Sequence, residues 1–247
     1  DARVRRVAQV DELRELYRRA SHRQNGALDR SPWFWQRAFA PRGVDTFASF
    51  VVEEAGHVTG CVSLGRENLG KEDKLLVRNA CATTPSALAR IAALCGDHRS
   101  VTEHIEVCGG AWPRLFDAVP DVLGYEVSYH RTWMLRIVDV VSALCARGYG
   151  AASPGELVVA IDDPARTANH GHFRLSLADG VMRVEPAGAN SPTLDARLGI
   201  AGLAALYTGH RSAFDLMQAG QLSGRDSALE TLSHWFSGPA PWCEDYF

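Results

Sequence analysis

Residues 46–65, TFASFVVEEAGHVTGCVSLG, decide the fold of the first half of the chain. The segment is rich in Val, Phe and Thr, which favour strands, and Ala55 and Gly56 interrupt it with a turn signal. We therefore expect two strands that are joined at Ala55 and Gly56.

The segments on either side add helices and further strands to this pair. Upstream, residues 10–21 carry apolar side chains at helical spacing. Residues 31–39 predict a second helix, with Ser31 as its N-cap and Pro32 at its first position. Downstream we expect a strand at 74–83, a helix at 84–98, a strand at 102–109, a short helix at 112–119 and a long strand at 125–139. This order predicts a mixed sheet with helices packed on it.

The composition of the sequence changes at residues 139–155, where an expected short helix is followed by Gly, Ser and Pro. Strands are expected at 156–163, 172–178 and 181–186, with a tight turn at Asp179 and Gly180 between the last two. Helices are expected at 198–209, 211–220 and 225–236. We place a domain boundary near Val138, which gives an α+β chain with domains 1–138 and 139–247.

The composition is that of a globular protein: 46% of the 247 residues are apolar, 22% are charged, and the net charge is −3. Neither positive nor negative charge dominates the sequence, so nothing points to nucleic acid or a membrane surface as a partner. No apolar run reaches the length of about 20 residues that a membrane helix needs. The short basic cluster Arg3, Arg5 and Arg6 is interpreted as the solvated face of a helix. The six cysteines are scattered without a C-x-x-C pair, which predicts a reduced, cytoplasmic protein.

Three short patterns are candidates for chemistry. His170 and His172 have the spacing of two ligands on one strand face, but no third ligand is identifiable, and we favour an exposed turn entering a strand over a metal site. Residues 147–152, RGYGAA, match the R-x-x-G-x-A loop that holds the pyrophosphate of coenzyme A in GNAT acetyltransferases. A strand and not a helix follows this loop, so we favour an interdomain linker. The aromatic cluster around Trp33 and Trp35 favours a core-facing helix over a recognition surface. We assign no metal-binding or cofactor-binding residue in the chain.

Several long strings resemble one family. They are LYRRASHRQNGALDRSPWFW, WMLRIVDVVSALCARGY, GELVVAIDDP, LGIAGLAALYTGHRSAFDLMQAGQL and APWCEDYF. Together they resemble the Eis (enhanced intracellular survival) family of GNAT acetyltransferases. Such proteins have a catalytic GNAT domain that binds acetyl-CoA, a second GNAT-like domain, and a domain like sterol carrier protein 2. Residues 1–138 resemble the central domain, and residues 139–247 resemble the last one.

The resemblance implies a specific chemistry for the end of the chain. In Eis-like enzymes the carboxylate of the last residue, which corresponds to Phe247, is the general base that takes a proton from a primary amine. Acetyl-CoA would be bound by an N-terminal GNAT domain that has no counterpart in these residues, and the sequence is expected to be a fragment. Trp242 would anchor the tail, and Glu244 and Asp245 would add negative potential for a polyamine. Family members tend to be hexameric, which leaves a homo-oligomer open.

Two alternatives remain. The second domain can be a binding module that encloses a hydrophobic small molecule between its sheet and its helices. The chain can also be a natural two-domain relative with different chemistry in a biosynthetic pathway, although no nucleophile or metal cluster in the sequence supports this.

Overall fold

The computed structural model describes residues 2–7, 9–22, 24–39, 46–68, 73–110, 114–119, 124–127, 132–150, 152–188 and 193–245. The chain forms two compact units. The first contains residues 1–130 together with 241–247, and the second contains residues 131–240. The last residues therefore group with the first unit, whereas the sequence assigned them to the second domain. Each unit is described below by itself.

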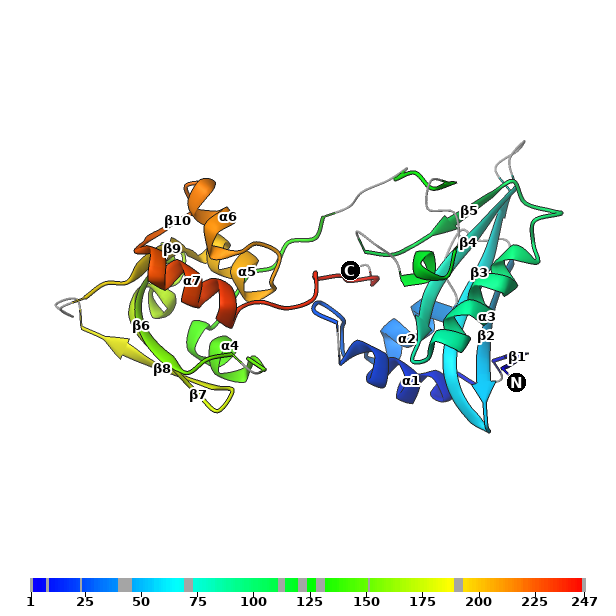
Figure 1. Ribbon diagram of the computed structural model, residues 1–247, viewed down its shortest axis with the longest axis horizontal. Coiled ribbons are helices and arrows are strands. Elements are labelled where there is room, and N and C mark those ends of the chain that lie inside the picture. Colours follow the sequence, from blue (N-terminus) through cyan, green and yellow to red (C-terminus); the bar gives the residue numbers. More distant parts are fainter. Residues whose placement is uncertain are drawn as a thin grey trace. The chain divides into compact units, whose positions relative to one another are not determined.

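The first unit is a five-stranded mixed sheet with helices on both faces (Figure 1). In chain order its elements are β1 (Arg3–Arg6), α1 (Asp11–Ser21), α2 (Pro32–Phe39), β2 (Thr46–Glu54), β3 (His57–Asn68), β4 (Asp73–Ala82), α3 (Pro85–Gly96), β5 (His104–Val107) and the 3₁₀ helix η1 (Arg114–Ala118). The strands lie in the order β1-β2-β3-β4-β5, and only the β4–β5 pair is parallel.

The period of two along β2 and β3 explains the layers of this unit. Val52 and Val62 lie in the cluster that α3 covers, whereas the neighbouring Val51 and Cys61 lie in the cluster formed with α1 and α2. Successive side chains of a strand point to opposite faces, so one hairpin fills both layers. Gly60 lets α3 approach closely, because a Cβ at this position would lie 3.1 Å from that of Ala87.

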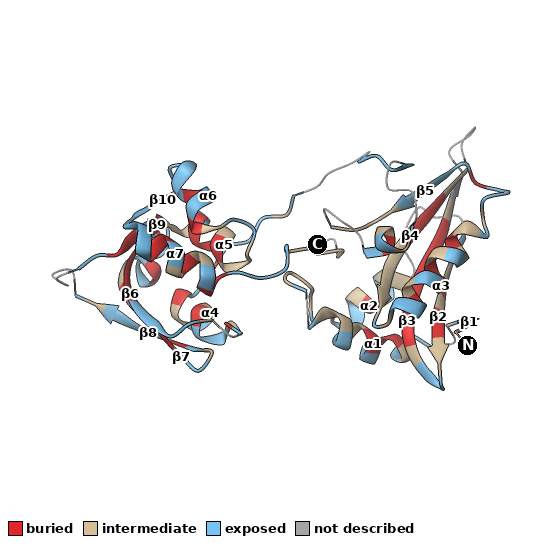
Figure 2. Cartoon of the chain, in the orientation of Figure 1, coloured by how far each residue is buried: buried red, intermediate tan, exposed pale blue. Residues whose placement is uncertain are grey.

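The second unit is a mixed sheet in the order β10-β9-β6-β7-β8, accompanied by helices. Its elements are α4 (Val140–Ala146), β6 (Gly155–Asp162), η3 (Thr167–Asn169), β7 (Gly171–Ala178), β8 (Val181–Ala187), β9 (Ala196–Gly199), α5 (Ile200–Tyr207), α6 (Ala213–Gln218), β10 (Leu222–Gly224) and α7 (Asp226–Trp235). Figure 2 shows the buried residues gathered between sheet and helices. In β7, Phe173, Leu175 and Leu177 alternate with less buried residues and enter this core.

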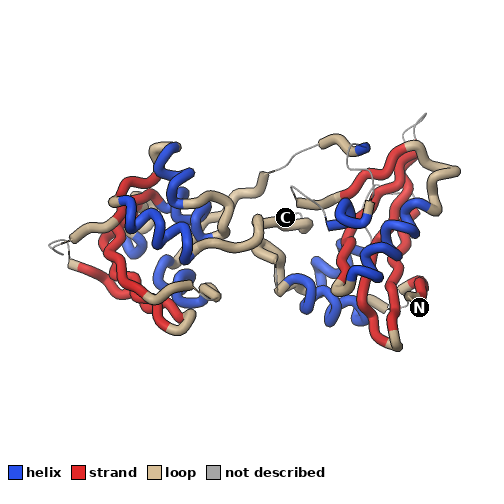
Figure 3. The backbone as a smooth tube through the Cα atoms, viewed as in Figure 1, coloured by secondary structure: helices blue, strands red, loops and turns tan. Residues whose placement is uncertain are grey.

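The predicted α+β class with mixed sheets and flanking helices is confirmed (Figure 3). Two local predictions were wrong. The cluster Arg3, Arg5 and Arg6 belongs to strand β1 and not to a helix, because Val4 between them pairs with Val52 of β2. The strand expected at 125–139 is not formed in its described parts, 125–127 and 132–139, where no residue pairs with a neighbouring strand.

Candidate functional site

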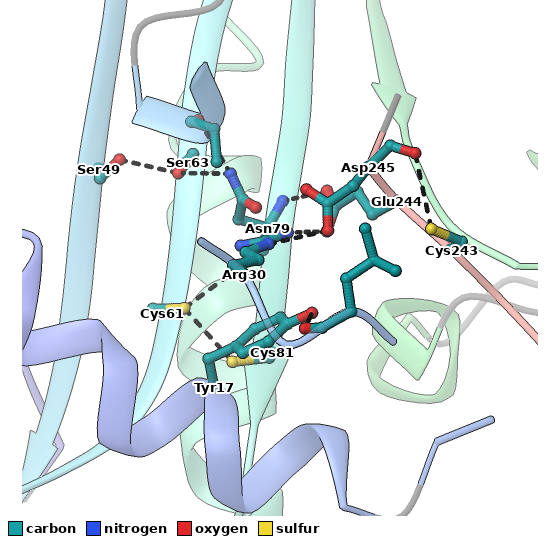
Figure 4. A network of polar contacts seen from close by, with 12 residues as sticks. Tyr17, Arg30, Ser49, Cys61, Ser63, Asn79, Cys81, Cys243, Glu244 and Asp245 are labelled. Carbon is teal, nitrogen blue, oxygen red and sulfur yellow. Dashed lines mark hydrogen bonds and ion pairs between the residues drawn. The ribbon is translucent and has the colours of Figure 1, made fainter. Parts of the chain in front are cut away.

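The predicted base, Phe247, lies outside the described residues, as does Tyr246. The structure describes the segment that leads to it. Residues 242–245, which we call the tail segment, contact the rest of the first unit at three points. The contacts are made by Trp242, Glu244 and Asp245, and Figure 4 shows the last two within a network of polar side chains.

The first contact depends on an irregularity in β4. Cys61 of β3 pairs with Cys81, and Ser63 pairs with Arg78, so the single residue Val62 stands opposite two residues of β4. This is a β-bulge, which interrupts the ladder of hydrogen bonds. Asn79, within the bulge, has a left-handed backbone with φ of +50°. Its backbone N–H donates to Oε1 of Glu244 in a close contact.

The side chain of Asn79 holds this conformation in place. Its Nδ2 donates to the carbonyl of Ala38 at 3.2 Å and to Oγ of Ser63 at 3.4 Å. Ser63 is in turn 2.8 Å from Oγ of Ser49 on β2. Asn is one of the few side chains that tolerate the left-handed region. The bulge thus presents a fixed N–H donor to the tail segment.

The second contact is an ion pair with Arg30, which lies between α1 and α2. The Arg30 side chain is 2% exposed, and its Nε donates to Oδ2 of Asp245 at 2.9 Å. Its Nη2 is 3.8 Å from Oε2 of Glu244. The guanidinium also lies over two aromatic rings, 4.3 Å from the centroid of Tyr17 and 5.1 Å from that of Trp35, which is a favourable cation–π arrangement.

The protonation of the network follows from burial. Burial raises the pKa of Glu244, and the nearby charge of Asp245 acts in the same direction, while Asn79 and Arg30 oppose the shift. Burial also raises the pKa of Tyr17 to about 12, so its hydroxyl stays neutral and donates to the carbonyl of Leu28 at 2.9 Å. This bond fixes the loop that carries Arg30.

The third contact is made by Trp242. Its backbone N–H donates to the carbonyl of Asn25 at 2.8 Å. Its side chain packs against Gly110, where an added Cβ would lie 3.4 Å from the Trp242 Cβ. The prediction that Trp242 anchors the tail is confirmed. Glu244 and Asp245, the expected source of negative potential for a polyamine, pair with Arg30, and the arrangement can bind and orient an acidic segment.

The loop 147–152 has a structural role in its described residues. The guanidinium of Arg147 donates to the carbonyls of Tyr207, Trp235 and Phe236 at 2.9–3.1 Å. It thereby caps the ends of α5 and α7, whose last carbonyls have no partner within the helix. The guanidinium of Arg147 is thus engaged by helix ends. The loop lies within the second unit, so it is not the interdomain linker that the sequence predicted.

The remaining candidates also have structural roles. Nδ1 of His170 pairs with Asp162 at 3.1 Å, and His172 lies in β7. Within the described residues, no group of three or more His, Cys, Asp or Glu side chains is arranged to hold a metal ion. Trp35 is buried as expected for a core-facing helix, but Trp33 is 53% exposed. All six cysteines are free.

Sequence reasoning missed Arg30 and Asn79. Arg30 lies in an Asp-Arg-Ser-Pro stretch that is typical of a polar loop, and a bulge leaves no clear sequence signal. One signal was available, since the string at 16–35 and the string at 240–247 were both among those that resembled one family. The structure brings these two strings into contact.

Comparison with known proteins identifies two domains. Residues 26–137 match an acetyltransferase (GNAT) domain, and residues 140–244 match a sterol carrier protein domain. In the described part of the chain, no helix has the length and apolar character needed to cross a membrane.

Relatives are found among curated proteins and solved structures. An uncharacterized N-acetyltransferase of Streptomyces griseus is 34% identical over 132 residues, which are 52% of this chain and 30% of the relative. A GCN5-related N-acetyltransferase from Anabaena variabilis has a TM-score of 0.90 and 27% identity, covering 100% of this chain and 63% of that one. One from Kribbella flavida has a TM-score of 0.78 and 27% identity, covering 100% of this chain and 60% of that one.

An Eis protein from Mycobacterium abscessus shares the fold, with a TM-score of 0.70 and 24% identity over 99% of this chain and 63% of that one. The chain therefore spans 30% of the curated relative and about three fifths of the solved ones. The resemblance noted in the sequence is confirmed as a GNAT acetyltransferase domain followed by a sterol carrier protein domain.

Proposed function

We propose that the chain is the C-terminal two-domain portion of an Eis-like, cytoplasmic acetyltransferase, which transfers acetyl from acetyl-CoA to a primary amine. The C-terminal carboxylate, on Phe247, would be the general base. Acetyl-CoA would be held by a GNAT domain outside this chain, and a homo-oligomer remains a prediction. The observation that carries the proposal is the docked tail segment, because a terminal base is useful only where the residues before it are held in place.

The proposed reaction requires this chain to supply a group that accepts a proton from the amine. An amine attacks the thioester carbonyl only with its lone pair free, and the nitrogen loses a proton as the N–C bond forms and the C–S bond breaks. An α-carboxyl has a free pKa of about 3.3–3.7, so it is ionised at neutral pH and can accept that proton when it is held within hydrogen-bond reach.

The assignment of acetyl-CoA to another domain has its own support. The one loop that resembles a coenzyme A motif uses Arg147 to cap two helices. We therefore expect no binding when acetyl-CoA is titrated into residues 1–247 in a calorimeter. Micromolar binding would contradict this part of the proposal.

The decisive experiment uses the polypeptide with its preceding region and a panel of amines that includes a polyamine, an aminoglycoside and lysine. A Gly-Ser extension after Phe247 moves the carboxylate away from its position, and Phe247→Leu keeps it there. We expect the extension to lower kcat by about 100-fold or more, which is the usual contribution of a general base, and Phe247→Leu to have a small effect. Full activity of the extended enzyme would exclude the terminal carboxylate as base.

The carrier alternative has less support. The apolar residues of α5 and α6 that were expected to line a cavity, such as Leu203, Leu206 and Leu216, pack into the core cluster of the second unit. Native mass spectrometry of freshly purified protein tests this alternative, because a retained hydrophobic ligand would favour carriage. No observation favours the two-domain biosynthetic relative.

A further inference from the structure

We propose that the first unit contains a carboxylate-binding socket whose ligand is the chain's own tail segment, and that Arg30 is a positioning residue for the terminal carboxylate. The existence of the socket stands on its own. The role of Arg30 in positioning rests on the proposed function.

Arg30 is the main reason for this inference. Its side chain is 2% exposed, and the two carboxylates that it pairs with both come from the tail segment. Separately buried charges are costly, and removing one member of a buried ion pair leaves the other without compensation. Undocking the tail segment would therefore leave the buried charge of Arg30 without its two carboxylates.

Asn79 supplies the second half of the socket. Its left-handed backbone is a conformation that side chains rarely adopt, and contacts to Ala38 and Ser63 hold it. This conformation directs an N–H to Glu244 that the β3–β4 ladder does not use. The N–H of this partly buried residue needs an acceptor in place of its strand partner, and the carboxylate of Glu244 is that acceptor.

The contacts together fix the direction of the segment. Trp242, Glu244 and Asp245 bind to Asn25, Asn79 and Arg30. Asn25 and Arg30 belong to the loop between α1 and α2, and Asn79 belongs to β4. A segment that is held at three of four consecutive residues cannot slide along its own axis. Because two residues span at most about 7 Å, a fixed Asp245 limits where the terminal carboxylate can act.

The socket is tested by hydrogen exchange on the full polypeptide, without reference to activity. In the Arg30→Gln variant we expect the amides of Trp242 and Asn79 to exchange at least ten times faster than in the wild type. Arg37→Gln, an exposed arginine on α2, is the matched control and should leave both amides protected. Unchanged exchange in Arg30→Gln would overturn the inference. If Arg30→Gln does not fold, Asp245→Asn provides the same test from the other side of the ion pair.

The positioning role is tested by kinetics in two backgrounds. In the wild-type background, we expect Arg30→Gln to lower kcat by about 100-fold, which is the order of loss when a reacting group is misplaced by an ångström, with little change in KM. Arg30→Lys, which keeps the charge and can still donate to Asp245, should recover part of the loss. In the background of the Gly-Ser extension, Arg30→Gln should lower kcat no further, because the carboxylate is already displaced.

The outcomes separate this inference from the proposed function. If the extension leaves kcat unchanged, the terminal base is excluded, whereas faster exchange in Arg30→Gln still supports the socket. If the extension abolishes activity but Arg30→Gln has full activity, the terminal carboxylate is supported as the base and the positioning role of Arg30 is overturned. Equal losses from Arg30→Gln in both backgrounds would indicate a purely structural role and would also overturn it.

Discussion

The two acidic residues of the tail segment contribute unequally to docking, and replacing each with its amide separates their contributions. Asp245→Asn removes the carboxylate that accepts from Nε of Arg30 at 2.9 Å, where the two side chains are 8% and 2% exposed. Breaking a buried ion pair by neutralising one partner costs about 3–5 kcal/mol. We expect the lower end, about 3 kcal/mol, because the rings of Tyr17 and Trp35 still face the guanidinium.

Glu244→Gln should cost far less. Burial already raises the pKa of Glu244 and so favours its neutral form. The Gln side chain keeps an oxygen that can accept from the N–H of Asn79, and it removes the negative charge beside Asp245. We expect a loss below about 1 kcal/mol, which is the usual value of a single hydrogen bond.

Hydrogen exchange of the peptides that cover the tail segment and β4 measures both effects, because the protection factors report local opening. A loss of 3 kcal/mol lowers protection by about 100-fold, since each 1.4 kcal/mol is a factor of ten. Glu230→Gln, an exposed position on α7, is the control. A loss of protection in Glu244→Gln as large as that in Asp245→Asn would refute the reasoning.

The dependence on pH has a defined sign. A carboxyl whose pKa is raised in the folded protein adds stability that is complete below its unfolded value, and it loses this stability as the pH rises through its folded value. The contribution of Glu244 to docking should therefore fall from about pH 4.5 upward. In Glu244→Gln this decline should disappear, and an unchanged decline would assign it to another group.

Three further predictions concern residues around the site. Asn79→Ala should destabilise the first unit by about 1–2 kcal/mol, because φ at this position is +50°. Asn79→Gly should cost less, since glycine adopts this φ freely. Equal losses of unfolding free energy in denaturant titrations would contradict the argument from the backbone. Arg147→Lys should lower the melting temperature, since a single ammonium cannot reproduce donation to three carbonyls, and an unchanged melting curve would rule out the capping role. The Sγ atoms of Cys61 and Cys81 lie 3.3 Å apart, so a mild oxidant should join them in a disulfide. The intact mass of the chain should then fall by two hydrogen atoms. Cys61→Ser should prevent this loss of mass.

The sequence predicted the elements whose formation depends on local signals. The turn of Asp179 and Gly180 formed as expected, with φ of +52° and +73°, because a short turn is fixed by its own residues. The helix at Pro85–Gly96 formed with Thr84 as its cap. These features need no information from distant parts of the chain.

The misses among the strands depend on distant partners. Val4 becomes part of a strand because it pairs with Val52, and neither position reveals this alone. The short strands β9 and β10 were not predicted either, and they pair with each other across α5 and α6. Residues 125–139 have the composition of a strand, but in the described parts no residue pairs with a neighbouring strand. A strand is stable only when a neighbour satisfies its backbone groups.

The candidate site also depends on distant partners, which here are oppositely charged side chains. Residues 24–31 form a polar loop, and residues 242–245 form an acidic tail, so each segment alone is typical of a solvated surface. Arg30 and Asp245 are 215 positions apart, and a buried guanidinium requires its carboxylate. We therefore expect the docking of the tail and the burial of the Arg30 side chain to be coupled. A segment that completes a buried ion pair is held in place before any substrate binds, which is the condition that the proposed general base on Phe247 would require.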